Sequence, residues 1–264
     1  MRKQFDIIML SDKARDFTLP VKDAALGYFF AEDFRTVLSQ LDAEWTVLAK
    51  PEIILSRDFL NETADLVNDF PYADAFAPRI VSEGKTISSG YLLDSRLGLF
   101  AESSLNDGNG MGNVASASPL CGIYSTRLLH ALECFDGDFR TDVRFFDLGL
   151  RALHLGANLF SVPHLQIEAK KNFPPDFFSF RELARAYYKD LDIVRFLKFT
   201  FRHPTTATAI FHDRKNLDEK SLRATELSKL TPETLQKITH SAKPRHYMAF
   251  AFKKRFSKST EESI

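Results

Sequence analysis

The chain has 264 residues, 44% of them hydrophobic and 27% charged, so it can bury a large core and does not have the composition of a disordered protein. Lysine plus arginine and aspartate plus glutamate number 35 each. This balance argues neither for nor against nucleic-acid binding, and no nucleic-acid partner is expected.

The cysteines and the first residues of the sequence bear on the compartment in which the protein is found. The two cysteines, Cys121 and Cys134, form no disulfide framework and no metal-ligand spacing, so we interpret them as buried thiols. The sequence has no run of about 18 apolar residues. Its start, MRKQFDIIMLSDK, is too short and too polar after the apolar core for a signal peptide. The sequence therefore predicts a cytoplasmic protein.

The first 45 residues contain two predicted strands and a helix. Residues 5–10 form a first apolar run, which is followed at once by Ser11 and Asp12 in a polar loop. Residues 26–30 predict a second strand. Apolar side chains at helical spacing predict a helix over residues 32–41, which leads into the next strand.

Residues 45–60, WTVLAKPEIILSRDFL, are the most informative stretch. The bias of residues 45–48 toward aromatic and β-branched side chains predicts a buried strand. Pro51 cannot donate to a sheet ladder, so Lys50-Pro51-Glu52 ends that strand. A helix is predicted to follow over residues 57–70, with Asp58 as its N-cap or first-turn acid. Ligands of open α/β sheets bind at the carboxyl ends of strands, so Lys50 and Glu52 are candidate ligand contacts.

The next hundred residues alternate between strand and helix patterns. Between them, residues 102–118 contain three glycines among Asn, Asp and Ser, which is typical of a mobile surface loop. The predicted regular elements are a strand at 75–81, a turn at 83–85, extended chain at 86–90, a strand running into a helix at 118–129, a helix to residue 155 closed by Gly156, and a strand at 158–162.

The periodicity becomes helical from Phe173, so residues 1–172 and 173–264 are predicted to be an α/β domain and a helical C-terminal extension. Residues 243–258 interleave aromatic and basic side chains. Such a tail can lie on anionic lipid, which would place the protein at the inner face of the membrane. The alternative is a helix that packs on the domain and leaves its basic face in solvent.

Residues 45–60, 118–129 and 135–151 together resemble the family 2 glycosyltransferases of the GT-A fold, especially the rhamnosyltransferase-like members. The resemblance covers roughly residues 5–171 in the family's order. It implies a mixed, mostly parallel sheet flanked by helices. It also implies an inverting hexosyltransferase, which moves sugar from a nucleotide-sugar to a glycan or glycoconjugate acceptor in surface polysaccharide synthesis.

The resemblance also implies site residues, and the chain departs from two motifs. The family's metal-binding Asp-X-Asp is replaced by Lys50 and Glu52. Glu52 would hold Mg or Mn weakly, and Lys50 would offset the diphosphate charge instead; the alternative is a solvated lysine in a bend. Ser11 and Asp12 are candidate nucleotide contacts, or a simple cap of a turn.

The second departure concerns the general base, the Asp of a Glu-Asp pair in the family. Arg144 and Phe145 occupy those positions, and phenylalanine cannot accept a proton. Asp142 and Asp147 are therefore the candidate catalytic residues, as carboxylates that could serve as the base. Asp147 is also expected to pair with Arg151 four residues later. Two hypotheses remain: an active glycosyltransferase, or an inactive relative that serves as a binding or partner subunit.

Overall fold

The structure is a computed structural model that describes residues 5–10, 26–30, 37–94, 99–102, 111–137, 139, 142–170, 182 and 186. Ser11, Asp12, most of the predicted mobile loop, all but two residues of the predicted 173–264 extension and the whole 243–258 tail lie outside these ranges. None of the described helices is long and apolar enough to cross a membrane.

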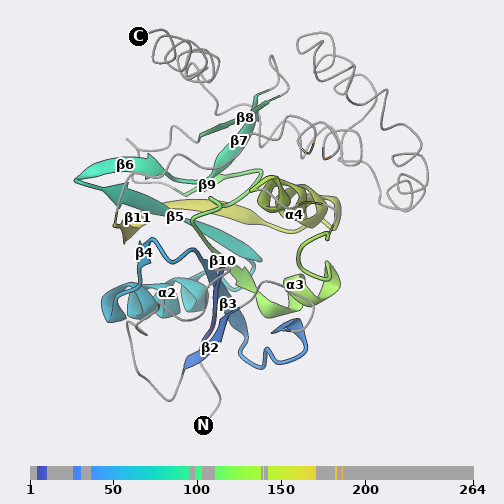
Figure 1. Cartoon of the computed structure of the whole chain (residues 1–264), viewed down its shortest axis with the longest axis horizontal. Helices are drawn as coiled ribbons and strands as arrows, with labels where there is room; N and C mark the ends of the chain where they lie inside the picture. The colour runs from blue at the N-terminus through green and yellow to red at the C-terminus, as the bar shows by residue number, and fades with distance from the viewer. Residues whose placement is uncertain are drawn as a thin grey trace, which may run out of the picture.

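In the described chain, runs of short strands are interrupted by the helices α2, α3 and α4 (Figure 1). The elements are β1 (Phe5–Met9), β2 (Leu26–Phe30), β3 (Trp45–Ala49), β4 (Ile53–Ile54), α2 (Arg57–Asp69), β5 (Ala75–Ser82), β6 (Lys85–Ser88), β7 (Tyr91–Asp94), β8 (Leu99–Glu102), β9 (Gly112–Asn113), β10 (Cys121–Ser125), α3 (Thr126–Ala131), α4 (Val143–His154) and β11 (Leu159–Ala169).

One mixed sheet carries the architecture, in the order β2-β1-β3-β10-β5-β11-β4. Strands β1, β2 and β3 are parallel to one another, and β5 is parallel to β11. Strand β10 runs antiparallel between β3 and β5, so β1, β2, β3, β5 and β11 point the same way. Strand β4 is antiparallel to β11, and β6 and β9 add to the sheet as antiparallel partners of β5 and β11. The sheet is thus mixed, as predicted, and its parallel pairs are those of β1 with β2, β1 with β3, and β5 with β11.

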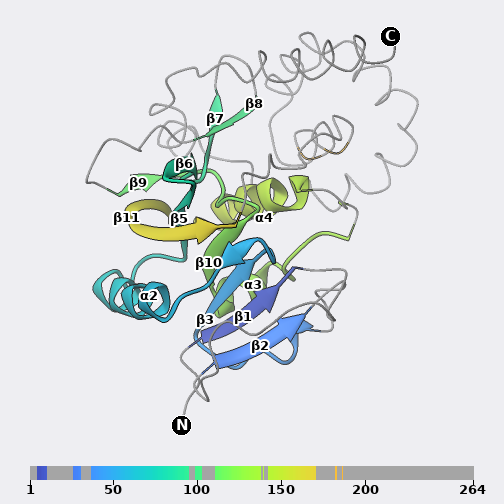
Figure 2. The same ribbon diagram turned by 60° about the vertical axis from the view of Figure 1, so that its left-hand side comes forward.

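Helices cover both faces of this sheet, with α2 on one side and α3 and α4 on the other (Figure 2). Strand side chains alternate between the two faces. Ile8 and Leu48 pack in the core with α3 and α4, whereas Ile7 and Val47 pack in the core with α2. Because both faces are buried, the strands read as continuous apolar runs in the sequence.

Helix α2 confirms the predicted helix, and of the two roles predicted for Asp58 the structure shows that of first-turn acid. Ser56 is the N-cap, and its hydroxyl accepts a hydrogen bond from the Phe59 amide at 3.1 Å. Asp58 lies in the first turn, where its negative charge is favourable for the helix dipole. Phe59, Leu60 and Thr63 begin the buried stripe that holds the helix on the sheet.

Strand β11 is longer than the predicted strand at residues 158–162. Pro163 lies inside β11, at a register shift in the pairing with β5 between Val162 and Gln166. A proline has no amide hydrogen for a ladder bond, and an irregularity lets the strand continue past it. The extra length brings the strand end to the Lys50 turn, where the Lys170 amide donates to the Glu52 carbonyl at 2.8 Å.

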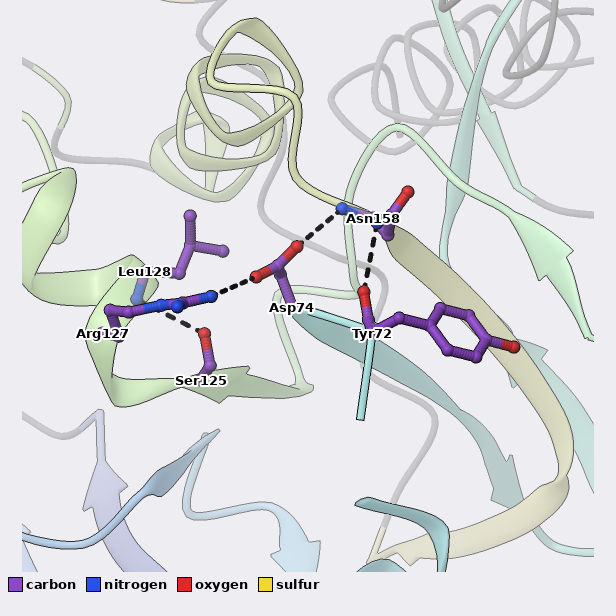
Figure 3. A network of polar contacts seen from close by, with 6 residues as sticks. All are labelled: Tyr72, Asp74, Ser125, Arg127, Leu128 and Asn158. Carbon is purple, nitrogen blue, oxygen red and sulfur yellow. Dashed lines mark hydrogen bonds and ion pairs between the residues drawn. The ribbon is translucent and has the colours of Figure 1, made fainter. Parts of the chain in front are cut away.

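A network of hydrogen bonds joins the strands at the end of the sheet opposite the Lys50 turn (Figure 3). Asp74, just before β5, accepts hydrogen bonds from the Asn158 amide at 3.0 Å and from Arg127 at 3.5 Å. The Asn158 side chain donates to the Tyr72 carbonyl, and the Ser125 amide donates to the Asp74 carbonyl. These contacts join the starts of β5 and β11 to the end of β10, so this network is structural.

The two cysteines are free and buried, as predicted. Burial raises the pKa of the Cys121 thiol to about 12, and burial also raises the pKa of the Cys134 thiol to about 12. Both thiols are therefore protonated and unreactive at neutral pH.

Candidate functional site

Lys50 immediately follows β3, at the carboxyl end of the parallel strands. Its amide donates to the Leu120 carbonyl at 2.9 Å, and its carbonyl accepts from the Ile53 amide at 3.0 Å. The Lys50 backbone is thus fixed between the start of β10 and a tight turn. Because Leu48 faces the α4 side of the sheet, the pleat directs the residue two positions later to that side too.

The Lys50 ammonium forms a two-oxygen ion pair with Asp142. Nζ lies 2.6 Å from Oδ1 and 2.7 Å from Oδ2 of the carboxylate. The Lys50 side chain is 20% exposed and that of Asp142 is 5% exposed, so Lys50 is the more exposed member of the pair. Two residues 92 positions apart, each a predicted site residue, therefore lie in direct contact.

Asp142 is the N-cap residue of α4, but its side chain makes no capping hydrogen bond. Its backbone already has helical dihedral angles, with φ −62° and ψ −10°, and its carbonyl accepts from the Phe145 amide. The carboxylate is directed to Lys50 instead. The positive end of the helix dipole and the Lys50 ammonium both favour the negative charge of this side chain.

Close packing on the sheet layer fixes the position of α4. A Cβ on Gly149 would lie 2.2 Å from the Ala115 carbonyl oxygen, so only glycine allows this approach. The Ser116 hydroxyl donates to the Phe145 carbonyl at 2.9 Å. These two contacts hold the helix whose first residue follows Asp142.

Asp147 pairs with Arg151, as predicted. Arg151 Nε donates to Asp147 Oδ2 at 2.7 Å, and the other two guanidinium nitrogens donate to the Leu132 and Cys134 carbonyls at 2.6 Å each. The Asp147 side chain is fully buried. These bonds tie α4 to the end of α3, so we interpret Asp147 as a residue that positions the helix.

Arg151 also holds an unusual segment of backbone. Glu133 and Cys134 have φ values of 53° and 55°, a conformation that residues other than glycine seldom adopt. The Arg151 bonds to the carbonyls of Leu132 and Cys134 bracket this segment. Arg151, which Asp147 holds in place, therefore supports the backbone that directly follows α3.

Phe145, which has the sequence position of the family's base, is a core residue. It is fully buried and contacts Phe135 edge to face, with a centroid distance of 4.8 Å. Phe146 packs against Tyr91 in the same way, at 5.1 Å. The helix thus turns the Phe145 side chain into the core, and this position presents no group to a ligand.

Arg144 adds a second cation to the first turn of α4. Its guanidinium carbon lies 4.9 Å from the centre of the Phe135 ring and 5.7 Å from that of Phe145. Contacts of this kind hold a cation over an aromatic face. The Arg144 guanidinium is thus held against the aromatic side chains of the core, whereas Lys50 is the cation in contact with Asp142.

Glu52 is half-buried in the turn after Lys50, and its Oε2 is shielded from solvent without a hydrogen-bond partner among the described residues. Among the residues that the structure describes, no group of three His, Cys, Asp or Glu side chains is placed to hold a metal ion. The ammonium of Lys50 stands where the first metal-binding acid is expected. The described residues therefore do not fit the divalent-metal site that the GT-A fold implies.

Sequence reasoning selected Lys50 and Asp142 separately and missed their contact. The available signal was a reversal of charge: a lysine replaces an acid at the end of β3, and the acid that remains near the base motif is Asp142. A compensating ion pair is one consequence of such a replacement. The sequence marks Arg144 only as the loss of an acid.

The sequence matches no protein-family model and no curated protein. The structure is similar to that of GalNAc-T7 with UDP, GalNAc and Mn²⁺, at a TM-score of 0.55 and 8% identity over 86% of this chain and 55% of that one. The chain thus spans about half of that structure. The structure of S. aureus TarS 1–349 in complex with UDP-GlcNAc also matches, at a TM-score of 0.47 and 13% identity, over 89% of this chain and 81% of that one. The mixed sheet and the likeness to GalNAc-T7 show that the described chain has the GT-A glycosyltransferase fold.

Proposed function

We propose that this protein is a glycosyltransferase that moves a hexose from a nucleotide-sugar to a glycan or glycoconjugate acceptor, with inversion, in the synthesis of a surface polysaccharide. The observation that carries the proposal is the contact between Lys50 and Asp142 at the carboxyl end of β3. There the GT-A fold brings together one cation and one carboxylate. Transfer needs both kinds of charge, one for the leaving group and one for the acceptor proton.

The chemistry assigns a role to each residue. The acceptor hydroxyl oxygen attacks the anomeric carbon from the side opposite the diphosphate, and Asp142 takes the hydroxyl proton as general base. The bond between the anomeric carbon and the diphosphate oxygen breaks, and its electron pair leaves with the nucleoside diphosphate. Lys50 offsets the negative charge that develops on that leaving group.

Binding of the donor is tested by thermal shift and calorimetry with a panel of nucleotide-sugars and nucleoside diphosphates, with Mn²⁺ and with EDTA. A charge-assisted bond to phosphate contributes roughly 1.5 to 3 kcal/mol, so Lys50→Gln should weaken binding about tenfold or more. Lys85→Gln, an exposed lysine of β6, is the matched control and should bind as the intact protein does. Equal binding by the Lys50 and Lys85 variants would remove Lys50 from the site.

The second candidate function is a catalytically inactive GT-A relative that binds a nucleotide-sugar, a glycan or a partner transferase. The phenylalanine at position 145 favours it, because this side chain has no proton acceptor and its burial leaves no room for another group at the position of the family's base. The two functions differ in one measurable respect. An inactive relative binds a nucleotide-sugar without releasing nucleoside diphosphate when acceptor is present.

A further inference from the structure

We propose that the donor diphosphate displaces Asp142 from Lys50, so that the Asp142 carboxylate becomes available as a base only after the donor has bound. This inference rests on the proposed function and adds an order to it, donor before acceptor. In the free protein the two groups hold each other through both carboxylate oxygens.

The engaged carboxylate is poorly placed to take a proton from a hydroxyl. Both of its oxygens lie within 2.7 Å of a single ammonium. The ammonium donates hydrogen bonds to them and stabilises their negative charge, which makes them weaker proton acceptors. The side chain is also 5% exposed, so an acceptor has little access to it. An acceptor that arrives before the donor therefore meets a carboxylate that is already bound.

Lys50 is the more exposed member of the pair. Its side chain is 20% exposed, four times the exposed fraction of Asp142, so an anion in solution contacts Lys50 more readily than an acceptor contacts Asp142. A lysine ammonium has three donors that rotate freely, and it is a compact charge suited to phosphate. A diphosphate brings more negative charge than one carboxylate, so it competes well for this cation.

The exchange requires only a side-chain movement. The Lys50 backbone is held by the Leu120 carbonyl and the Ile53 amide, and Asp142 is held at the start of α4. The four-carbon stem of lysine lets Nζ swing from the carboxylate to a nearby anion while both backbones stay in place. The dipole of α4 continues to favour the negative charge on Asp142 after Lys50 has left.

A double-mutant cycle tests the competition by calorimetry. The four proteins are the intact chain, Lys50→Gln, Asp142→Asn and the double variant, and the probes are inorganic pyrophosphate, UDP, GDP, CDP and dTDP. If Asp142 competes for Lys50, Asp142→Asn should bind diphosphate about tenfold more tightly than the intact chain. With Gln at position 50, the same Asp142→Asn change should alter binding less than about twofold.

A control separates competition from a general effect of charge. Asp65→Asn removes one negative charge from an exposed position of α2 and should bind as the intact chain does. Melting curves establish that each variant is folded. If Asp142→Asn is not folded, Asp142→Ser takes its place.

The outcomes separate this inference from the proposed function. Tighter binding only when Lys50 is present supports the exchange. If the intact chain binds diphosphate but the Asp142 variants bind it no more tightly, or gain equally with and without Lys50, the exchange is wrong and the proposed function stands. If none of the proteins binds any of the diphosphates, the proposed function is wrong and the exchange falls with it.

Discussion

Replacing Asp147 by alanine should destabilise the fold strongly without touching the ligand site directly. The substitution removes the partner of Arg151 Nε, while Arg151 itself stays 8% exposed. Breaking a buried ion pair by removing one partner costs about 3 to 5 kcal/mol. Because Arg151 keeps its bonds to the Leu132 and Cys134 carbonyls, we expect the lower end, about 3 kcal/mol.

The loss can be followed by urea or thermal unfolding through the fluorescence of the single tryptophan, Trp45, which is 8% exposed in β3. For a domain of this size, a loss of about 3 kcal/mol lowers Tm by about 6 to 12 °C. Asp65→Ala, on the exposed face of α2, is the control and should change stability by less than about 0.5 kcal/mol. An Asp147→Ala protein as stable as the control, but without transfer activity, would refute the positioning role and make Asp147 the catalytic residue.

Four further predictions follow from packing, charge and burial. Gly149→Ala should lower the free energy of unfolding by about 1 to 3 kcal/mol or more, because its Cβ meets the Ala115 carbonyl at 2.2 Å; urea titration showing no loss would contradict the packing of α4. Donor binding should change less than about threefold on adding EDTA, since one carboxylate leaves a Mg²⁺ site mostly to water; abolished binding would mean that Glu52 is joined by other ligands. Cys121 and Cys134 should react with a thiol reagent at pH 8 only after unfolding, and reaction of the native protein would contradict their burial. Burial raises the pKa of each thiol from 9.0 to about 12. The contribution of the two thiols to stability is therefore fully present below pH 9 and is lost as the pH rises toward 12. Denaturant titrations across that pH range can measure the loss.

Local sequence signals predicted much of the fold. The aromatic and β-branched run at residues 45–48 became β3, which is buried on both faces. The helical pattern from residue 57 became α2, which is buried on the face that its period indicates. Gly156, with φ 79°, follows the end of α4 as predicted. The predicted strand at 158–162 was too short, because a register shift lets β11 continue past Pro163.

The site was harder to predict than the fold. The contact between Lys50 and Asp142 joins two segments 92 residues apart, and no local periodicity reports such a pairing. The inward direction of Phe145 depends on where α4 begins and how it packs on Ser116, which a motif match does not specify. The pair of Asp147 and Arg151 was predictable, because both residues lie on one helix at a spacing of four.

The central claim is that Asp142, released from Lys50, takes the acceptor proton. Its most direct test is the rate of nucleoside diphosphate release from the nucleotide-sugar that binds, in the presence of acceptor, for the intact protein and for Asp142→Asn. General-base assistance contributes roughly 10² to 10⁴ in rate, so the variant should be slower by that factor while still binding the donor. Release by Asp142→Asn at the rate of the intact protein would contradict the account.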